Sequence, residues 1–205
     1  MPLILASASP RRRELMAQAG LACTVEASTV DEAALPGEAA AAYVERLAIE
    51  KAQAVWGRVR AEGRLQDETV VLGADTAVVL PEGTILGKPA NAADARRMLA
   101  QLSGRTHSVM TGVAAVSMRR TVADVEITHV TMNVIRPEEI DAYVASGEPL
   151  DKAGAYAIQG YAARWIPRIE GDYGNVVGLP IARVVSLLAE AAEVDPPVAR
   201  ASHRK

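Results

Sequence analysis

One acidic residue, Asp75, interrupts the most apolar stretch of the sequence, TVVLGADTAVVL. The valine-rich run predicts a strand that is buried on both faces, and burying an unpaired carboxylate in such a strand is energetically unfavourable. Either Gly73 ends the strand and Asp75 caps a turn, or the carboxylate lies at the edge of a site. In the second interpretation, which we favour, Asp75 acts as a general base or metal ligand and Thr76 adds a nearby hydroxyl.

A cluster of cations follows the first apolar segment, in LILASASPRRR. Ser9 is a favourable N-cap and Pro10 a favourable first helical residue, so we expect the arginines at 11–13 in the first turn of a helix. Cations oppose the helix dipole at that position, and a solvated basic turn is the simpler alternative. Because the helix-opening N–H groups and the hydroxyls of Ser7 and Ser9 lie nearby, we favour an anion site, which one or two of the arginines could reach.

Isolated polar residues elsewhere could complete such a site. Lys51, Lys88 and Lys152 each stand beside a glycine or an acid, although each could equally be a surface lysine. Gln159 lies in a small, apolar stretch between two glycines, where a buried amide would need partners such as a nucleobase edge. The alternative is a tight loop in which the Gln159 amide makes its hydrogen bonds within the loop. Glu32 could join the strand carboxylate in holding a divalent cation, or it could belong to an exposed acidic turn.

The bulk composition limits the partners and the compartment. The chain has 205 residues, of which 50% are hydrophobic and 23% charged, with a formal net charge of -3, which argues against a general nucleic-acid or membrane-surface binder. The single cysteine, Cys23, favours a reducing compartment, and the apolar start is too short for a secretory signal, so we expect a cytoplasmic protein. The sequence has no GxxxxGK[ST] loop and no GxSxG motif, and its three histidines lack metal-ligand spacing.

Strands and helices alternate along the chain, with a β-rich middle. This order predicts an α/β fold, in which one central mixed sheet is flanked by helices, and it leaves open whether the fold divides into two lobes. We expect residues 1–192 to form a single domain and residues 193–205 a flexible tail. Strands are predicted near residues 2–6, 22–28, 69–80, 106–118, 122–135 and 165–171, and helices near 10–19, 38–56, 91–101, 136–147 and 179–192.

Several longer motifs occur in the order typical of the Maf family, from Leu3 to about Leu188. They are LASASPRR, YVERLAIEKA, VLGADTAVVL, ILGKP, MLAQLSGRTHSVMTGV, YVASGEPLDKAGAYAIQG and GDYGNVVGLPI. The sequence thus resembles a family of nucleoside triphosphate pyrophosphatases. The resemblance implies an elongated sheet with a nucleotide-binding cleft, often in a homodimer. It also implies hydrolysis to a monophosphate and pyrophosphate, assisted by a divalent cation such as Mg²⁺, Mn²⁺ or Co²⁺.

The resemblance also implies roles for individual residues. Asp75 would be the general base that activates water, and Glu32 and Asp75 would hold the metal. Thr76 and Gln159 resemble the branch that acts on dTTP and UTP, with modified pyrimidine nucleotides as further candidate substrates. The alternatives are the branch that acts on 7-methyl-GTP and, from another class, a nucleotide-binding regulator of septum formation. The substrate-binding set would be Ser7, Ser9, Arg11, Arg12, Lys51, Thr76, Lys88 and Gln159.

Overall fold

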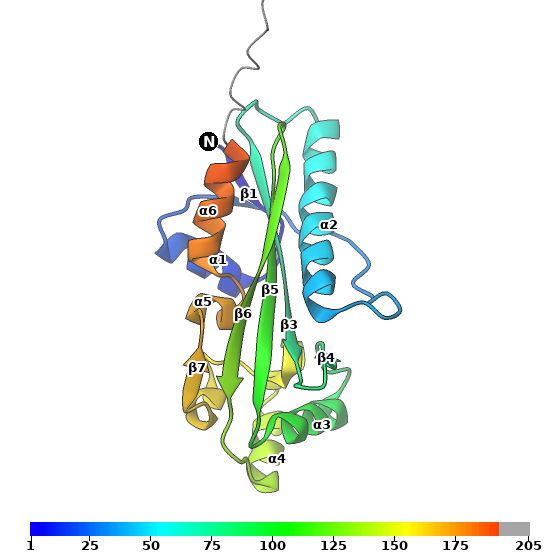
Figure 1. Ribbon diagram of the computed structural model, residues 1–205, viewed down its shortest axis with the longest axis vertical. Coiled ribbons are helices and arrows are strands. Elements are labelled where there is room, and N and C mark those ends of the chain that lie inside the picture. The colour runs from blue at the N-terminus through cyan, green and yellow to red at the C-terminus, as the bar shows by residue number, and fades with distance from the viewer. Residues whose placement is uncertain (193–205) are drawn as a thin grey trace, which may run out of the picture.

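The fold is built on one elongated, mixed β-sheet (Figure 1), as the alternating pattern predicts. A computed structural model describes residues 1–192, so the predicted flexible tail at 193–205 lies outside the described residues. The seven strands are β1 (Leu3–Leu5), β2 (Thr24–Val25), β3 (Val70–Val79), β4 (Ile85–Leu86), β5 (Thr106–Val116), β6 (Thr121–Thr131) and β7 (Arg168–Glu170). The helices are α1 (Pro10–Gln18), α2 (Ala40–Ala61), α3 (Ala92–Leu102), α4 (Pro137–Ala145), α5 (Tyr173–Val177) and α6 (Ile181–Ala192), with 3-10 turns η1 (Glu148–Asp151), η2 (Ala153–Ala155) and η3 (Tyr161–Trp165).

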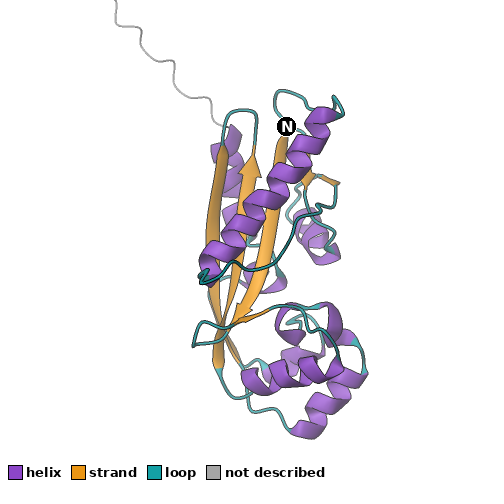
Figure 2. Cartoon of the chain, turned by 90° about the vertical axis from the view of Figure 1, so that its right-hand side faces the viewer, coloured by secondary structure: helices purple, strands orange, loops and turns teal. Residues whose placement is uncertain are grey.

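The strand order is β2-β1-β3-β5-β6-β7, and β4 pairs with the end of β3. β1 runs parallel to β2 and β3, whereas the remaining pairs are antiparallel. The long strands β3, β5 and β6 form the spine of the molecule, and helices cover both of its faces at one end. α2 runs along one face, and α1 and α6 cover the other. At the opposite end, α3, α4 and the 3-10 turns gather into a second lobe (Figure 2).

Several details differ from the predicted elements. The strands predicted at 122–135 and 165–171 are shorter in the structure, as β6 and β7. The predicted helix at 38–56 continues to Ala61, because the buried apolar positions of α2 extend to Val59. The predicted strand at 22–28 is reduced to the two residues of β2, which pair only with β1. The short helix α5 and the 3-10 turns were not predicted, since segments of three to five residues are too short to show a helical period.

Two glycines allow α2 to lie directly on the sheet. A Cβ at Gly73 in β3 would be 2.1 Å from the carbonyl oxygen of Ala48, and a Cβ at Gly112 in β5 would be 2.2 Å from that of Val44. Real Cβ atoms do not approach backbone oxygens this closely, so a side chain at either position would push the helix away. The close contact brings Lys51 of α2 within reach of Asp75 in β3.

The core of the second lobe contains a buried polar pair. The Nε2 of His107 in β5 lies 2.8 Å from the hydroxyl oxygen of Tyr156, and the two rings meet edge to face at 5.5 Å. His107 is nearly inaccessible to solvent, and its Nδ1 has no hydrogen-bond partner among residues 1–192. Burial in these surroundings lowers the pKa of His107 to about 4. The imidazole is therefore neutral in the folded protein at physiological pH.

We predict that Gly112→Ala lowers the free energy of unfolding by about 2 kcal/mol, because the new methyl group overpacks the contact between α2 and β5. The matched control is Gly57→Ala on the exposed side of α2, where an added Cβ meets nothing within 4 Å. That change should raise stability by about 0.5–1 kcal/mol, since alanine is the better helix former. Urea unfolding of both variants measures the difference, and equal effects would contradict the close-packing argument.

Stability should also fall in acid because of His107. The unfolded residue takes up a proton near pH 6.5, whereas the folded residue stays neutral until about pH 4. Protonation therefore favours the unfolded state between these values, and the loss reaches about 3 kcal/mol at the lower limit. His107→Gln should remove this component, so its urea-unfolding free energy should change less than that of the wild type from pH 6.5 to 4. Parallel curves for the two proteins would show that His107 is not the cause.

Candidate functional site

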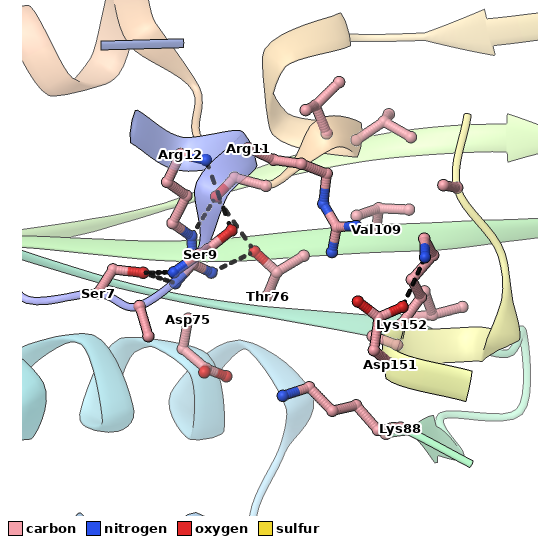
Figure 3. Close-up of a pocket in the computed structure, with 18 of the residues that line it drawn as sticks. Ser7, Ser9, Arg11, Arg12, Asp75, Thr76, Lys88, Val109, Asp151 and Lys152 are labelled. Carbon is pink, nitrogen blue, oxygen red and sulfur yellow. Dashed lines mark hydrogen bonds and ion pairs between the residues drawn. The ribbon is translucent and has the colours of Figure 1, made fainter. Parts of the chain in front are cut away.

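The candidate site lies where one edge of β3 has no strand partner. β1 pairs with β3 only as far as Leu72, and β4 pairs with it only at Val78 and Val79, so residues 73–77 face no described strand on that edge. The chain leaves β1 at this point and enters α1. A pocket of about 720 Å³ lies along the open edge and is lined by residues from both lobes (Figure 3). This volume is in the range typical of small-ligand sites.

A lysine links two carboxylates on the pocket wall. The Nζ of Lys51 lies 2.6 Å from Asp75 Oδ1 and 2.6 Å from Glu32 Oε1. Asp75 is in the middle of β3 and, like Lys51, has only 8% of its surface exposed. The interpretation of Asp75 as a turn cap after a strand end at Gly73 is therefore wrong. The ammonium group gives the buried carboxylate the partner that burial requires.

Glu32 extends from an irregular loop that is attached to α2. Tyr43 donates a hydrogen bond of 2.9 Å from its hydroxyl to the carbonyl oxygen of Glu32. Burial opposes the negative charge of Glu32, but the hydrogen bond and charge of Lys51, together with the charges of Lys88 and Arg12, hold its pKa below the ordinary value. Burial and the charges of the two acids raise the pKa of Tyr43 to about 12. The loop thus presents an ionised carboxylate beside a neutral phenol.

Arg12 is bound almost entirely by protein atoms. Its guanidinium donates to the carbonyl oxygens of Ala74 at 2.7 Å and Gly178 at 2.8 Å, and to the hydroxyls of Thr76 at 3.0 Å and Ser7 at 3.4 Å. Burial lowers the pKa of Arg12, although the nearby carboxylate of β3 opposes this effect. Arg12 therefore joins α1, the open edge of β3 and the turn before α6.

Arg11 and Lys88 differ from Arg12 in this respect. Neither side chain makes a hydrogen bond or an ion pair to any of residues 1–192. Lys88 points toward Asp75, and Arg11 extends over the pocket toward Asp151 (Figure 3). The start of α1, which carries Arg11, is capped by Ser9, whose hydroxyl accepts from the Arg12 N–H at 3.5 Å. Two cations with uncommitted donors and a helix N-terminus can together bind a polyphosphate.

The side of the pocket that the second lobe forms includes several apolar residues. Val78, Val109, Tyr156 and Ile158 line it, and Gln159 stands beside them. Gln159 is exposed, so the predicted buried amide is wrong: the residue belongs to the loop between η2 and η3, at the mouth of the pocket. An apolar slot with an amide at its mouth can accept a flat ring and bind the polar edge of that ring.

All ten predicted site residues line this one pocket. Tyr43 also lines it, and its only signal in the sequence is its place two turns before Lys51 on the same helix. Lys152 lines it as well, but its Nζ is bound to the Glu148 carbonyl oxygen and to Asp151, both at 2.5 Å. The polar lining residues that the predictions missed are Ser28, Tyr43, Asp151 and Tyr156.

Two of the acids that line the pocket, Glu32 and Asp75, converge on one point, whereas the third, Asp151, is paired with Lys152. No group of three or more His, Cys, Asp or Glu side chains within residues 1–192 could hold a metal ion. Glu32 and Asp75 nevertheless approach the same cation, the Lys51 ammonium group. Mg²⁺ is typically held by one or two carboxylates, with phosphate oxygens and water completing its shell. The donor set thus fits a divalent cation that is bound together with a polyphosphate.

We predict that alanine substitution affects ligand binding at Arg11 but stability at Arg12. Arg11→Ala should weaken the binding of inorganic tripolyphosphate about tenfold and leave stability unchanged, because the Arg11 side chain has no hydrogen-bond or ion-pair partner within residues 1–192. Arg12→Ala should lower the free energy of unfolding by about 3 kcal/mol, since several partly buried acceptors lose a charged donor. Titration calorimetry and urea unfolding of both variants give the two quantities. A large loss of stability in Arg11→Ala would contradict this division.

Comparison with known proteins agrees with the geometry. Residues 2–191 match a family model described as Maf-like protein. A dTTP/UTP pyrophosphatase of Moorella thermoacetica is 54% identical over 191 residues, covering 91% of this chain and 93% of the relative. One from Anaeromyxobacter sp. is 52% identical over 194 residues, covering 92% and 89%, and one from Hahella chejuensis is 49% identical over 188 residues, covering 92% and 91%. The chain belongs to the Maf family.

Proposed function

We propose that this protein hydrolyses dTTP and UTP to the corresponding monophosphate and pyrophosphate. The observation that supports this best is the position of Asp75, which is held by Lys51 on the wall of a pocket that also contains uncommitted cations. The names of the relatives, each a dTTP/UTP pyrophosphatase over nearly its whole length, support the same substrates. Modified pyrimidine nucleotides with the same base edge are further candidates.

Binding of the triphosphate is assigned to the polar end of the pocket. A nucleoside triphosphate brings about four negative charges, so a chain with a net charge of -3 must concentrate cations locally to hold it. Arg11 and Lys88 have free donors for this purpose, and the N–H groups that open α1 add partial positive charge. Arg12 holds Ser7 and Thr76 in place through its own hydrogen bonds. The apolar lining residues of the second lobe, with Gln159 beside them, would then accept the base.

The chemical step is assigned to Asp75. Its carboxylate takes a proton from a water molecule as the water oxygen attacks the α-phosphorus. The bond from this phosphorus to the oxygen that bridges the α- and β-phosphates breaks, and pyrophosphate leaves with the electron pair. Lys51 keeps the base in position, and the cations stabilise the charge that develops on the phosphate oxygens. A divalent cation such as Mg²⁺, Mn²⁺ or Co²⁺, for which Glu32 and Asp75 are the available ligands, neutralises phosphate charge when bound.

Two further assignments belong to this proposal. We propose that the protein works in the cytoplasm, where its nucleotide substrates are made, and the lone cysteine is consistent with a reducing compartment. Within residues 1–192 the longest helices are too polar or too short to cross a bilayer. We also propose a homodimer, on the basis of the family resemblance; size-exclusion chromatography with light scattering tests this assignment directly.

We predict that Asp75→Asn folds normally and loses activity about 10²–10⁴-fold, because the amide cannot accept the proton of the attacking water. The assay is pyrophosphate release from dTTP, UTP, CTP, 7-methyl-GTP and the common purine triphosphates, with Mg²⁺ or Mn²⁺. Asp67→Asn, at an exposed position ahead of β3, is the matched control and should keep full activity. Near-normal turnover by Asp75→Asn would refute the assignment of the base.

The same panel tests the substrate. Wild-type activity that is highest with dTTP and UTP supports the proposal, and a preference for 7-methyl-GTP would keep the chemistry but overturn the roles of Thr76 and Gln159. No release from any nucleotide, together with intact nucleotide binding, would favour a regulator of septum formation. A chelator should abolish the activity, and added Mg²⁺ should restore it.

A further inference from the structure

The segment that carries Gln159 is fixed to the protein on both sides. On its N-terminal side, the hydroxyl of Tyr156 contacts His107, and the N–H of Gly154 donates to the carbonyl oxygen of Gly87 at 3.0 Å. Ala155 between them has φ of 59°, the only positive φ of a residue other than glycine within residues 1–192. Such a backbone persists only where its surroundings hold it. These contacts explain the place of Tyr156, but they do not reach Gln159.

On the C-terminal side the contact is made by Glu148, the first residue of η1. Its Oε1 accepts a hydrogen bond from the Tyr143 hydroxyl at 3.0 Å and another from the Tyr161 N–H at 3.2 Å. A Cβ added at Gly160 would lie 1.9 Å from the same oxygen. The carboxylate therefore occupies the space that a side chain at 160 would need, directly beside the residue that follows Gln159.

Tyr143, whose hydroxyl donates to Glu148, is itself held in place by aromatic contacts. Tyr143 is buried, and its ring stacks on Tyr161 at 5.6 Å and meets Trp165 edge to face at 5.3 Å. The backbone of Glu148 is also tied, because its carbonyl oxygen accepts from Lys152 Nζ. An aromatic cluster of the second lobe, formed by Tyr143, Tyr161 and Trp165, thus defines where the carboxylate lies. Glu148 does not line the pocket, so any effect on a ligand must act through the Gln159 loop.

We infer that Glu148 is a positioning residue that holds Gln159 at the mouth of the pocket and thereby sets the preference between nucleobases. The inference rests on the proposed function, in which Gln159 faces the base. An amide has one acceptor and one two-hydrogen donor group, so it distinguishes the edges of different pyrimidines only when its orientation is fixed. A loop released from Glu148 would still cover the pocket, but it would no longer present the amide in one orientation.

The first test compares Glu148→Ala with Glu148→Gln. In Glu148→Ala, the KM for dTTP should rise about tenfold with kcat within about threefold of wild type, and the ratio of kcat/KM for dTTP to that for CTP should fall about tenfold. Glu148→Gln should stay within about threefold of wild type in all three quantities, because its carbonyl oxygen can still accept both hydrogen bonds. Inhibition by inorganic tripolyphosphate, which has no base, should be unchanged in both variants. Glu138→Gln, an exposed carboxylate on α4, is the matched control.

A second variant reaches the same contact from the other side. Gly160 has φ of -104°, a conformation that alanine adopts without strain, so Gly160→Ala acts mainly through the clash with the Glu148 carboxylate. Alone, it should reproduce the loss of selectivity between dTTP and CTP. In the Glu148→Ala background the clash is absent, so adding Gly160→Ala should cause no further loss. This non-additivity separates the contact from a general loss of stability.

The outcomes distinguish the inference from the proposed function. If wild-type protein releases no pyrophosphate from dTTP or UTP, the proposed function fails. If the wild type is active and Glu148→Ala retains its KM and its substrate ratio, only the positioning role is refuted. A lower melting temperature with an equal loss of Vmax on every nucleotide, at constant KM and ratio, would also refute it, since this is the result of a purely structural role.

Discussion

The direct contact between α2 and the sheet is the constraint on which the site depends. The helix backbone reaches this depth only because Gly73 and Gly112 have no side chains. The depth in turn places the Lys51 ammonium group 2.6 Å from Asp75. If the helix lay further out, the carboxylate would be buried without a partner, which is among the least favourable states for a charged group. The ion pair between Lys51 and Asp75 therefore depends on the close packing of α2 against Gly73 and Gly112.

The two arginines in the first turn of α1, Arg11 and Arg12, have different roles. Helical geometry directs successive side chains about 100° apart, so Arg11 and Arg12 meet different surroundings although they are adjacent in the chain. Arg12 points toward backbone carbonyl oxygens and connects three parts of the fold through hydrogen bonds. Arg11 points over the pocket (Figure 3), so its N–H groups are available to a ligand. One short motif thus supplies both a structural connection and a free cation. Although its total charge is slightly negative, the chain lines this pocket with five Lys and Arg side chains against three acids.

Local rules explain which parts of the site could be predicted from the sequence. The Ser9 cap and the valine-rich strand around Asp75 depend on neighbouring residues alone, and both are confirmed. The partners of Arg12 could not be predicted, because they are carbonyl oxygens distant in the chain, and every residue carries one. The exposure of Gln159 was predicted wrongly, since an apolar neighbourhood in the sequence does not determine which side of a loop faces solvent. Tyr43 could not be singled out, because its ring fits an apolar helix position and its hydroxyl has no signature of its own.

The open edge of β3 has a consequence for the behaviour of the protein in solution. A strand edge with free N–H and C=O groups is a template for pairing with another chain, and proteins generally cover such edges or charge them. Here the guanidinium group of Arg12 donates a hydrogen bond to the carbonyl oxygen of Ala74. A neighbouring strand would otherwise donate a backbone N–H to this oxygen. A charged side chain blocks a foreign strand but leaves room for a small ligand. The arrangement that keeps the gap available for binding therefore also protects the protein against aggregation through that edge.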